Sequence, residues 1–114
     1  MAYPVVHWEI GGRDMPALRD FYAKAFGWTV TDADSSYAMV AAAEGGLGGG
    51  LMQTPDGVPP YVTVYVQVDD LDAALEEITQ LGGTRLIPPT AVSESVSFAM
   101  FRDPQGNVVG LLKR

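Results

Sequence analysis

The stretch VVHWEIGGRDMPALRDFYAKAFG, residues 5–27, decides the fold because it contains a complete strand, turn and helix. The apolar run Val5–Ile10 predicts a strand, and the glycines after it predict its end. Asp14 is the expected N-cap of the helix, and Gly27 is the expected end. Apolar residues recur at helical spacing and predict one buried stripe, which consists of Leu18, Phe21, Tyr22, Ala25 and Phe26.

The same order occurs again in VTVYVQVDDLDAALEEITQLGG, residues 62–83. Strict alternation over Val62–Val68 predicts a strand with one buried face. Asp70 then caps a second helix, which ends at Gly82-Gly83. Three further strands are expected after each helix, at residues 28–32, 37–42 and 49–53 in the first half and at 84–87, 96–102 and 107–112 in the second.

A shift of 56 residues places Asp14 on Asp70 and Gly27 on Gly83. The order strand, helix and three strands is therefore present twice, which predicts an α+β fold made of two βαβββ modules. The predicted boundaries are about 4–53 for the first module, about 54–60 for a Pro- and Gly-rich linker, and about 61–114 for the second. Together the modules form a single domain over residues 1–114.

Composition excludes several classes of protein. The 114 residues carry a net charge of −7, which disfavours nucleic acid and anionic membrane surfaces as partners. The absence of cysteine rules out disulfides and thiolate metal sites. No apolar run of about 20 residues predicts a membrane helix, and the first residues do not resemble a secretory signal. A cytoplasmic location is expected.

An ordered set of short motifs resembles the vicinal oxygen chelate superfamily, which includes glyoxalase I, extradiol dioxygenases, fosfomycin-resistance enzymes and bleomycin-resistance binding proteins. This resemblance implies curled mixed sheets that form half-barrels, with the helices packed outside and a ligand cavity on the concave side. It also implies a homodimer. The motifs that carry it are His7-Trp8-Glu9-Ile10, Asp14, Phe21-Tyr22, Phe26-Gly27-Trp28, Gly49-Gly50-Leu51, Tyr65, Val68-Asp69-Asp70, Gly82-Gly83 and Asp103-Pro104-Gln105-Gly106.

The resemblance also indicates where a metal ion would bind. Metal-dependent members hold a divalent ion with side chains from the first and last strand of each module, and these positions correspond here to His7, Gly50, Thr63 and Gly110. Only His7 is a common metal ligand, so we expect these positions to be vestigial, with no metal or other cofactor. Glu44, in the loop before Gly50, is the nearest carboxylate and stays open as an alternative ligand.

Alternation also predicts which side chains line the cavity. His7 and Glu9 share one face of the first strand, while Val6, Trp8 and Ile10 face the helices. A half-solvated sheet without any function would give the same alternation. The face of strand 96–102 that lines the cavity stays undecided. The candidate ligand-binding residues are His7, Glu9, Met52, Thr63, Tyr65 and Gln67.

The function expected from these observations is metal-independent binding of a small, partly apolar or aromatic molecule, sequestering a metabolite or an antibiotic. The alternative is a glyoxalase-like lyase or isomerase, or a dioxygenase, which either depends on a metal or uses His7 and Glu9. The expected partners are the small-molecule ligand and a second copy of the chain, without nucleic acid or membrane.

Overall fold

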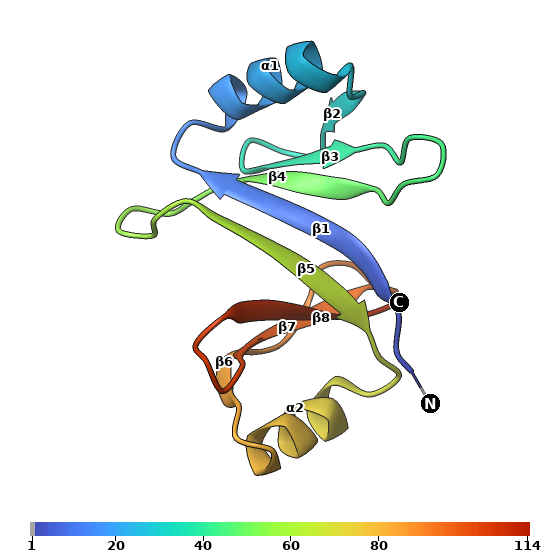
Figure 1. The fold of residues 1–114 in the computed structure, drawn as a ribbon, viewed down its shortest axis with the longest axis vertical. Helices are drawn as coiled ribbons and strands as arrows, with labels where there is room; N and C mark the ends of the chain where they lie inside the picture. The colour runs from blue at the N-terminus through green and yellow to red at the C-terminus, as the bar shows by residue number, and fades with distance from the viewer. Residues whose placement is uncertain (1) are drawn as a thin grey trace. The chain divides into compact units, whose positions relative to one another are not determined.

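The computed structural model describes residues 2–114, which fall into two compact units (Figure 1). One unit runs from His7 to Thr63, and the other combines the N-terminal segment up to Val6 with Val64–Arg114. The elements are β1 (Val5–Gly12), α1 (Met15–Phe26), β2 (Val30–Asp32), β3 (Tyr37–Val40), β4 (Gly49–Gln53), β5 (Tyr61–Gln67), α2 (Leu71–Gln80), β6 (Thr84–Ala91), β7 (Ser97–Arg102) and β8 (Val108–Lys113). This order confirms the α+β class and the two βαβββ modules.

In the unit His7–Thr63 the strands are ordered β2-β3-β4-β1. β1 and β4 are parallel, and the other two neighbouring pairs are antiparallel. Helix α1 covers one face of this sheet (Figure 1). The core between helix and sheet contains the buried residues Met15, Ala38, Val40 and Leu51, with Trp8, Ile10, Leu18, Tyr22, Trp28 and Val30 packed against them.

The other unit repeats this plan with the strand order β5-β8-β7-β6. β5 and β8 are parallel, like β1 and β4, and β7 is antiparallel to both of its neighbours. The N-terminal segment belongs to this unit because the amide of Gln67 donates to the carbonyl of Pro4 at 2.9 Å. The core under α2 contains Val68, Leu71, Leu75, Ala99 and Leu111.

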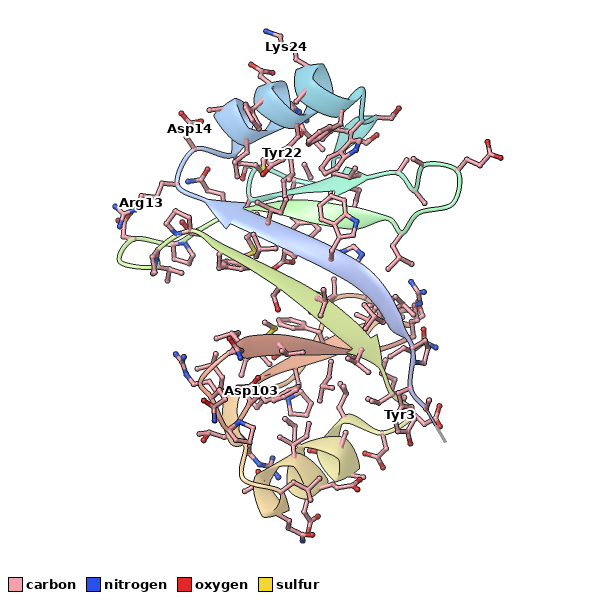
Figure 2. All side chains as sticks on the ribbon, viewed as in Figure 1. Tyr3, Arg13, Asp14, Tyr22, Lys24 and Asp103 are labelled. Carbon is pink, nitrogen blue, oxygen red and sulfur yellow. The ribbon has the colours of Figure 1, made fainter. Side chains whose placement is uncertain are left out.

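The two predicted N-caps and the predicted end of α1 are confirmed, whereas α2 ends at Gln80 with Leu81 as its C-cap, just before the predicted Gly82-Gly83. The carboxylate of Asp14 accepts from the amide of Ala17 at 3.1 Å, and that of Asp70 accepts from Ala73 at 3.0 Å. Figure 2 shows Asp14 at the start of α1. Gly27 ends α1 in the left-handed conformation, with φ 69°, which a residue with a Cβ atom adopts only with strain. The caps satisfy backbone groups that the first and last helical turns leave unpaired.

The predicted apolar stripe of α1 is only partly correct. Leu18 and Tyr22 pack on the sheet, but Phe21 and Phe26 are 61% and 64% exposed. The side of α1 that packs on the sheet is therefore narrower than the apolar side of the helix that the sequence predicts. Phe26 instead stacks on Tyr22 and Trp28, with ring centroids 6.1 and 5.4 Å apart, so contacts among aromatic rings replace burial in the core.

One expectation for the second half needs correction. Val66 and Val68 pack under α2, but Val62 is 74% exposed and Val64 is also exposed, because this ten-residue helix covers only the last part of β5. The strands β4 and β8, which contain Gly50 and Gly110, are not sheet edges. Each of them pairs on both sides, and the edge strands of the two units are β2 and β6.

Within residues 2–114, no helix is long and apolar enough to cross a membrane.

Candidate functional site

The face of the His7–Thr63 sheet that points away from α1 carries the polar residues. The parallel register pairs Glu9 with Gly50, and the antiparallel register pairs Tyr37 with Met52. Side chains alternate along each strand, so these residues and His7 share one face, opposite Trp8, Ile10 and Leu51. The structure therefore places His7, Glu9 and Met52 on one surface, together with a tyrosine that the sequence analysis missed.

His7 is hydrogen-bonded on this surface. Its Nε2 lies 2.9 Å from the hydroxyl of Tyr37, the first residue of β3. The tautomer of the ring decides which partner donates. Tyr37 is thirty positions from His7 in the chain, and only the pairing of β3 with β4 and of β4 with β1 brings the two together.

Glu9, the acidic residue on this face, is buried, with only 4% of the residue exposed. The hydroxyl of Tyr61 donates to its Oε2 at 2.5 Å, a short distance typical of a hydrogen bond to a carboxylate. Burial, the hydrogen bond to Glu9 and the charge of Glu9 all raise the pKa of Tyr61 far above its usual value. Tyr61 therefore keeps its proton, and it shields a carboxylate that would otherwise be costly to bury.

A tyrosine ring covers each of the two glycines that stand at predicted metal positions, Gly50 and Gly110. A Cβ atom built on Gly50 would overlap the phenol of Tyr37, and one built on Gly110 would overlap the ring of Tyr65. The register pairs Glu9 with Gly50 in one unit and Tyr65 with Gly110 in the other, so the two glycines hold equivalent positions. Any larger residue at either position requires the ring to move.

The remaining predicted ligand-binding residues are distributed between the two units. Thr63 is buried at the end of the His7–Thr63 unit. Tyr65, 6% exposed, and Gln67 belong to the other unit, where Oε1 of Gln67 accepts from Arg114 at 3.2 Å. Strand β7 presents its two faces to different surroundings. Ala99 and Phe101 join the core under α2, and Met100 pairs with Gly110 on the face of Tyr65.

The four predicted metal positions supply one imidazole, one neutral hydroxyl and two glycines. Such a set lacks the three or four donors that bind a divalent ion tightly. Within residues 2–114, no three His, Cys, Asp or Glu side chains gather in a group that could hold a metal. Glu44 lies in an exposed turn, and the β1–β4 register places Gly50 rather than Glu44 beside Glu9.

Two cavities are present in the unit that contains α2. They lie on the side of its sheet that α2 covers, opposite the face of Tyr65. Their volumes are about 120 and 200 Å³, and both are lined by Tyr3, Val68, Ala74 and Glu77. The larger one is mainly apolar and continues the core under α2. Neither contains a hydrogen-bonded pair like His7–Tyr37 or Glu9–Tyr61. We therefore place the candidate site on the face of the His7–Thr63 sheet that carries these two pairs.

The chain belongs to the Glyoxalase/Bleomycin resistance protein/Dioxygenase superfamily, whose family model matches residues 5–111. This membership confirms the resemblance found in the sequence.

Particular relatives are similar at low identity. CFP32 of Mycobacterium bovis, which carries a provisional glyoxylase name, is 28% identical over 86% of this chain and 41% of its own length. The anthracycline biosynthesis protein DnrV of Streptomyces peucetius is 29% identical over 86% of this chain and 42% of its own. The chain thus spans about two fifths of the length of these two curated relatives. Methylmalonyl-CoA epimerase of Streptomyces coelicolor shares the fold, with a TM-score of 0.70 at 18% identity over 98% of this chain and 94% of the epimerase.

Proposed function

We propose that this protein binds a small, partly apolar or aromatic molecule without a metal ion, on the face that carries His7, Glu9, Tyr37, Met52 and Tyr61. The observation that carries the proposal is the position of Tyr37, which covers Gly50 and engages His7 at 2.9 Å. The phenol of Tyr37 forms a hydrogen bond with the imidazole of His7 and also fills the space beside Gly50 that a metal-ligating side chain would need. Metal-dependent chemistry would require both of them to be available.

The chemistry of the surface supports this ligand class. Tyrosine rings and Met52 offer apolar, adaptable contact area, while the hydroxyl, imidazole and carboxylate groups orient a ligand by hydrogen bonds. The kinship with DnrV, a protein named for anthracycline biosynthesis, is consistent with a polycyclic aromatic ligand. Sequestration of such a compound requires only binding.

A thermal-shift screen against aromatic antibiotics and metabolites, including an anthracycline, tests the proposal. We expect at least one hit that raises the Tm in the presence of EDTA. Tyr37→Phe removes one hydroxyl and keeps the ring, so it should weaken binding of that hit by about 0.5–1.5 kcal/mol, measured by calorimetry. The matched control is Tyr3→Phe in the other unit, which should bind normally. Hits that need added Zn²⁺ or Mn²⁺, or that bind Tyr37→Phe unchanged, would count against the proposal.

A metal-free isomerase that uses His7 and Glu9 is the second candidate function. It is favoured by the buried carboxylate of Glu9, and by kinship with proteins named glyoxylase and epimerase. A positioned carboxylate and an imidazole can together remove and return a proton next to a carbonyl group. Exchange of substrate protons for solvent deuterium, abolished in Glu9→Gln, would distinguish catalysis from binding.

A homodimer is part of the proposal, and the exposed valines of β5 are its support. Val62 is 74% exposed and Val64 is also exposed, which is unusual for apolar residues of a strand. Val62→Asp should give a particle near the chain's 12.2 kDa by light scattering, whereas the wild type should give about twice that mass. The Tm extrapolated to low protein concentration should hardly change, because Val62 packs on no core. A monomeric wild type at micromolar concentration would refute the dimer.

A further inference from the structure

We infer that Tyr37 is the residue that excludes divalent cations from this face, because its phenol occupies the volume of a metal-ligating side chain at Gly50 and restrains His7. The inference rests on the proposed function and names the residue responsible for metal independence. A side chain from a neighbouring strand fills the space of a metal ligand, which is a further change beyond the loss of the ligand itself.

The first step is steric. Any Cβ atom on Gly50 would overlap the hydroxyl and ring carbons of Tyr37. Tyr37 does not lie directly opposite Gly50, because the register pairs Gly50 with Met39 and pairs Tyr37 with Met52. The ring therefore reaches diagonally along the face to cover the glycine, a distance that aromatic side chains span in antiparallel sheets.

The second step is chemical. A carboxylate at residue 50 and the imidazole of His7 would be two of the donors that a divalent ion requires. Gly50 lacks the first donor, and the phenol fills the volume that such a side chain would need; the phenol also engages the second donor, the imidazole, by a hydrogen bond of 2.9 Å. A neutral phenol is itself a poor ligand for such ions. One side chain therefore acts on two of the three predicted metal positions in the His7–Thr63 unit, His7 and Gly50.

The third step is repetition. In the other unit, the ring of Tyr65 covers Gly110 in the same way, although Tyr65 comes from β5 and Tyr37 comes from β3. Two tyrosines from different strands thus cover two equivalent glycines. The rings of Tyr61 and Trp8 cover Gly11 and Gly49 as closely, so the hydrogen bond of Tyr37 to His7, and not the covering of a glycine alone, distinguishes Tyr37.

The steric step is tested with wild type, Gly50→Ala, Tyr37→Ala and Tyr37→Ala/Gly50→Ala. Gly50→Ala should lower the Tm by roughly 4–8 °C in the wild type, because its methyl group displaces the ring, and by much less in the Tyr37→Ala background. The ¹⁵N shift of Nε2 in His7, the one histidine of the chain, should change in Gly50→Ala as it does in Tyr37→Phe. Equal Tm losses in both backgrounds, or an unchanged shift, would overturn the inference.

The cation step is tested with Co²⁺ alone as the probe, followed by its visible absorption. Tyr37→Ala/Gly50→Glu should bind Co²⁺ at least about tenfold more tightly than Gly50→Glu alone, since both carry the added carboxylate and only the double variant lacks the phenol that fills its place and engages His7. Adding His7→Ala should abolish the gain. A double variant that binds Co²⁺ no better than Gly50→Glu would show that Tyr37 is not what excludes the ion. Neither measurement needs an organic ligand, so failure of the ligand screen and failure of this inference are distinguishable.

Discussion

Leu51→Ala is expected to lower the free energy of unfolding by about 2–5 kcal/mol, the largest loss that a single truncation in the His7–Thr63 unit should cause. Leu51 is fully buried in the middle of β4 and belongs to the core under α1. Removing three carbons there leaves a cavity between the helix and the sheet that the neighbouring side chains fill only in part. Urea unfolding followed by circular dichroism gives the difference directly.

Met39→Ala is the matched control, because Met39 lies on the neighbouring strand β3 with its side chain exposed. It should cost less than about 1 kcal/mol. Similar losses for Leu51→Ala and Met39→Ala would mean that the core under α1 is not where the structure puts it, and that the assignment of the opposite face to ligand binding has lost its basis.

Tyr61→Phe is expected to destabilise the protein by about 1–3 kcal/mol, because it removes the hydroxyl that donates to the buried Glu9 at 2.5 Å. The loss should lie near the lower end of that range, since Tyr61 is half-buried and water can replace part of the bond. Tyr3→Phe, at an exposed tyrosine, is the control and should change stability by less than about 0.5 kcal/mol.

The same variant should change how stability depends on pH. The pKa of Tyr61 is raised in the folded protein by burial and by Glu9, so the unfolded chain loses this proton at a lower pH than the folded chain does. The stabilisation is therefore complete below about pH 10 and is lost as the pH rises above it. Wild type should lose stability more steeply than Tyr61→Phe in this alkaline range. Parallel pH profiles would contradict the raised pKa of Tyr61, and with it the burial of its hydroxyl beside Glu9.

The parts of the fold that the sequence predicted are those with local causes. Asp14 and Asp70 each bond to a backbone amide three residues away, and Gly27 adopts a left-handed conformation by itself. Alternation correctly placed Trp8 and Ile10 toward α1 and away from His7 and Glu9. These signals act over a few residues, so the sequence alone contains them.

The parts that could not be predicted depend on strand pairing and on the extent of each helix. Tyr37 and Tyr61 reach their partners across 30 and 52 residues of sequence, and nothing local marks them as site residues. The clue that existed was the pair of glycines at expected ligand positions, because glycine in a strand often marks the close approach of another group. The exposure of Val62 and Val64 likewise depended on how far α2 extends over β5.

The central claim is that this face binds its ligand through Tyr37 and His7 without a metal. Because the chain has one histidine, the ¹⁵N resonances of the His7 ring report on the site alone in tag-free protein. The most direct measurement records these resonances with one equivalent of Zn²⁺, then with EDTA, then with the best hit of the screen. We expect no change with Zn²⁺ or EDTA and a clear shift with the hit. A stoichiometric shift on adding Zn²⁺, reversed by EDTA, would contradict it.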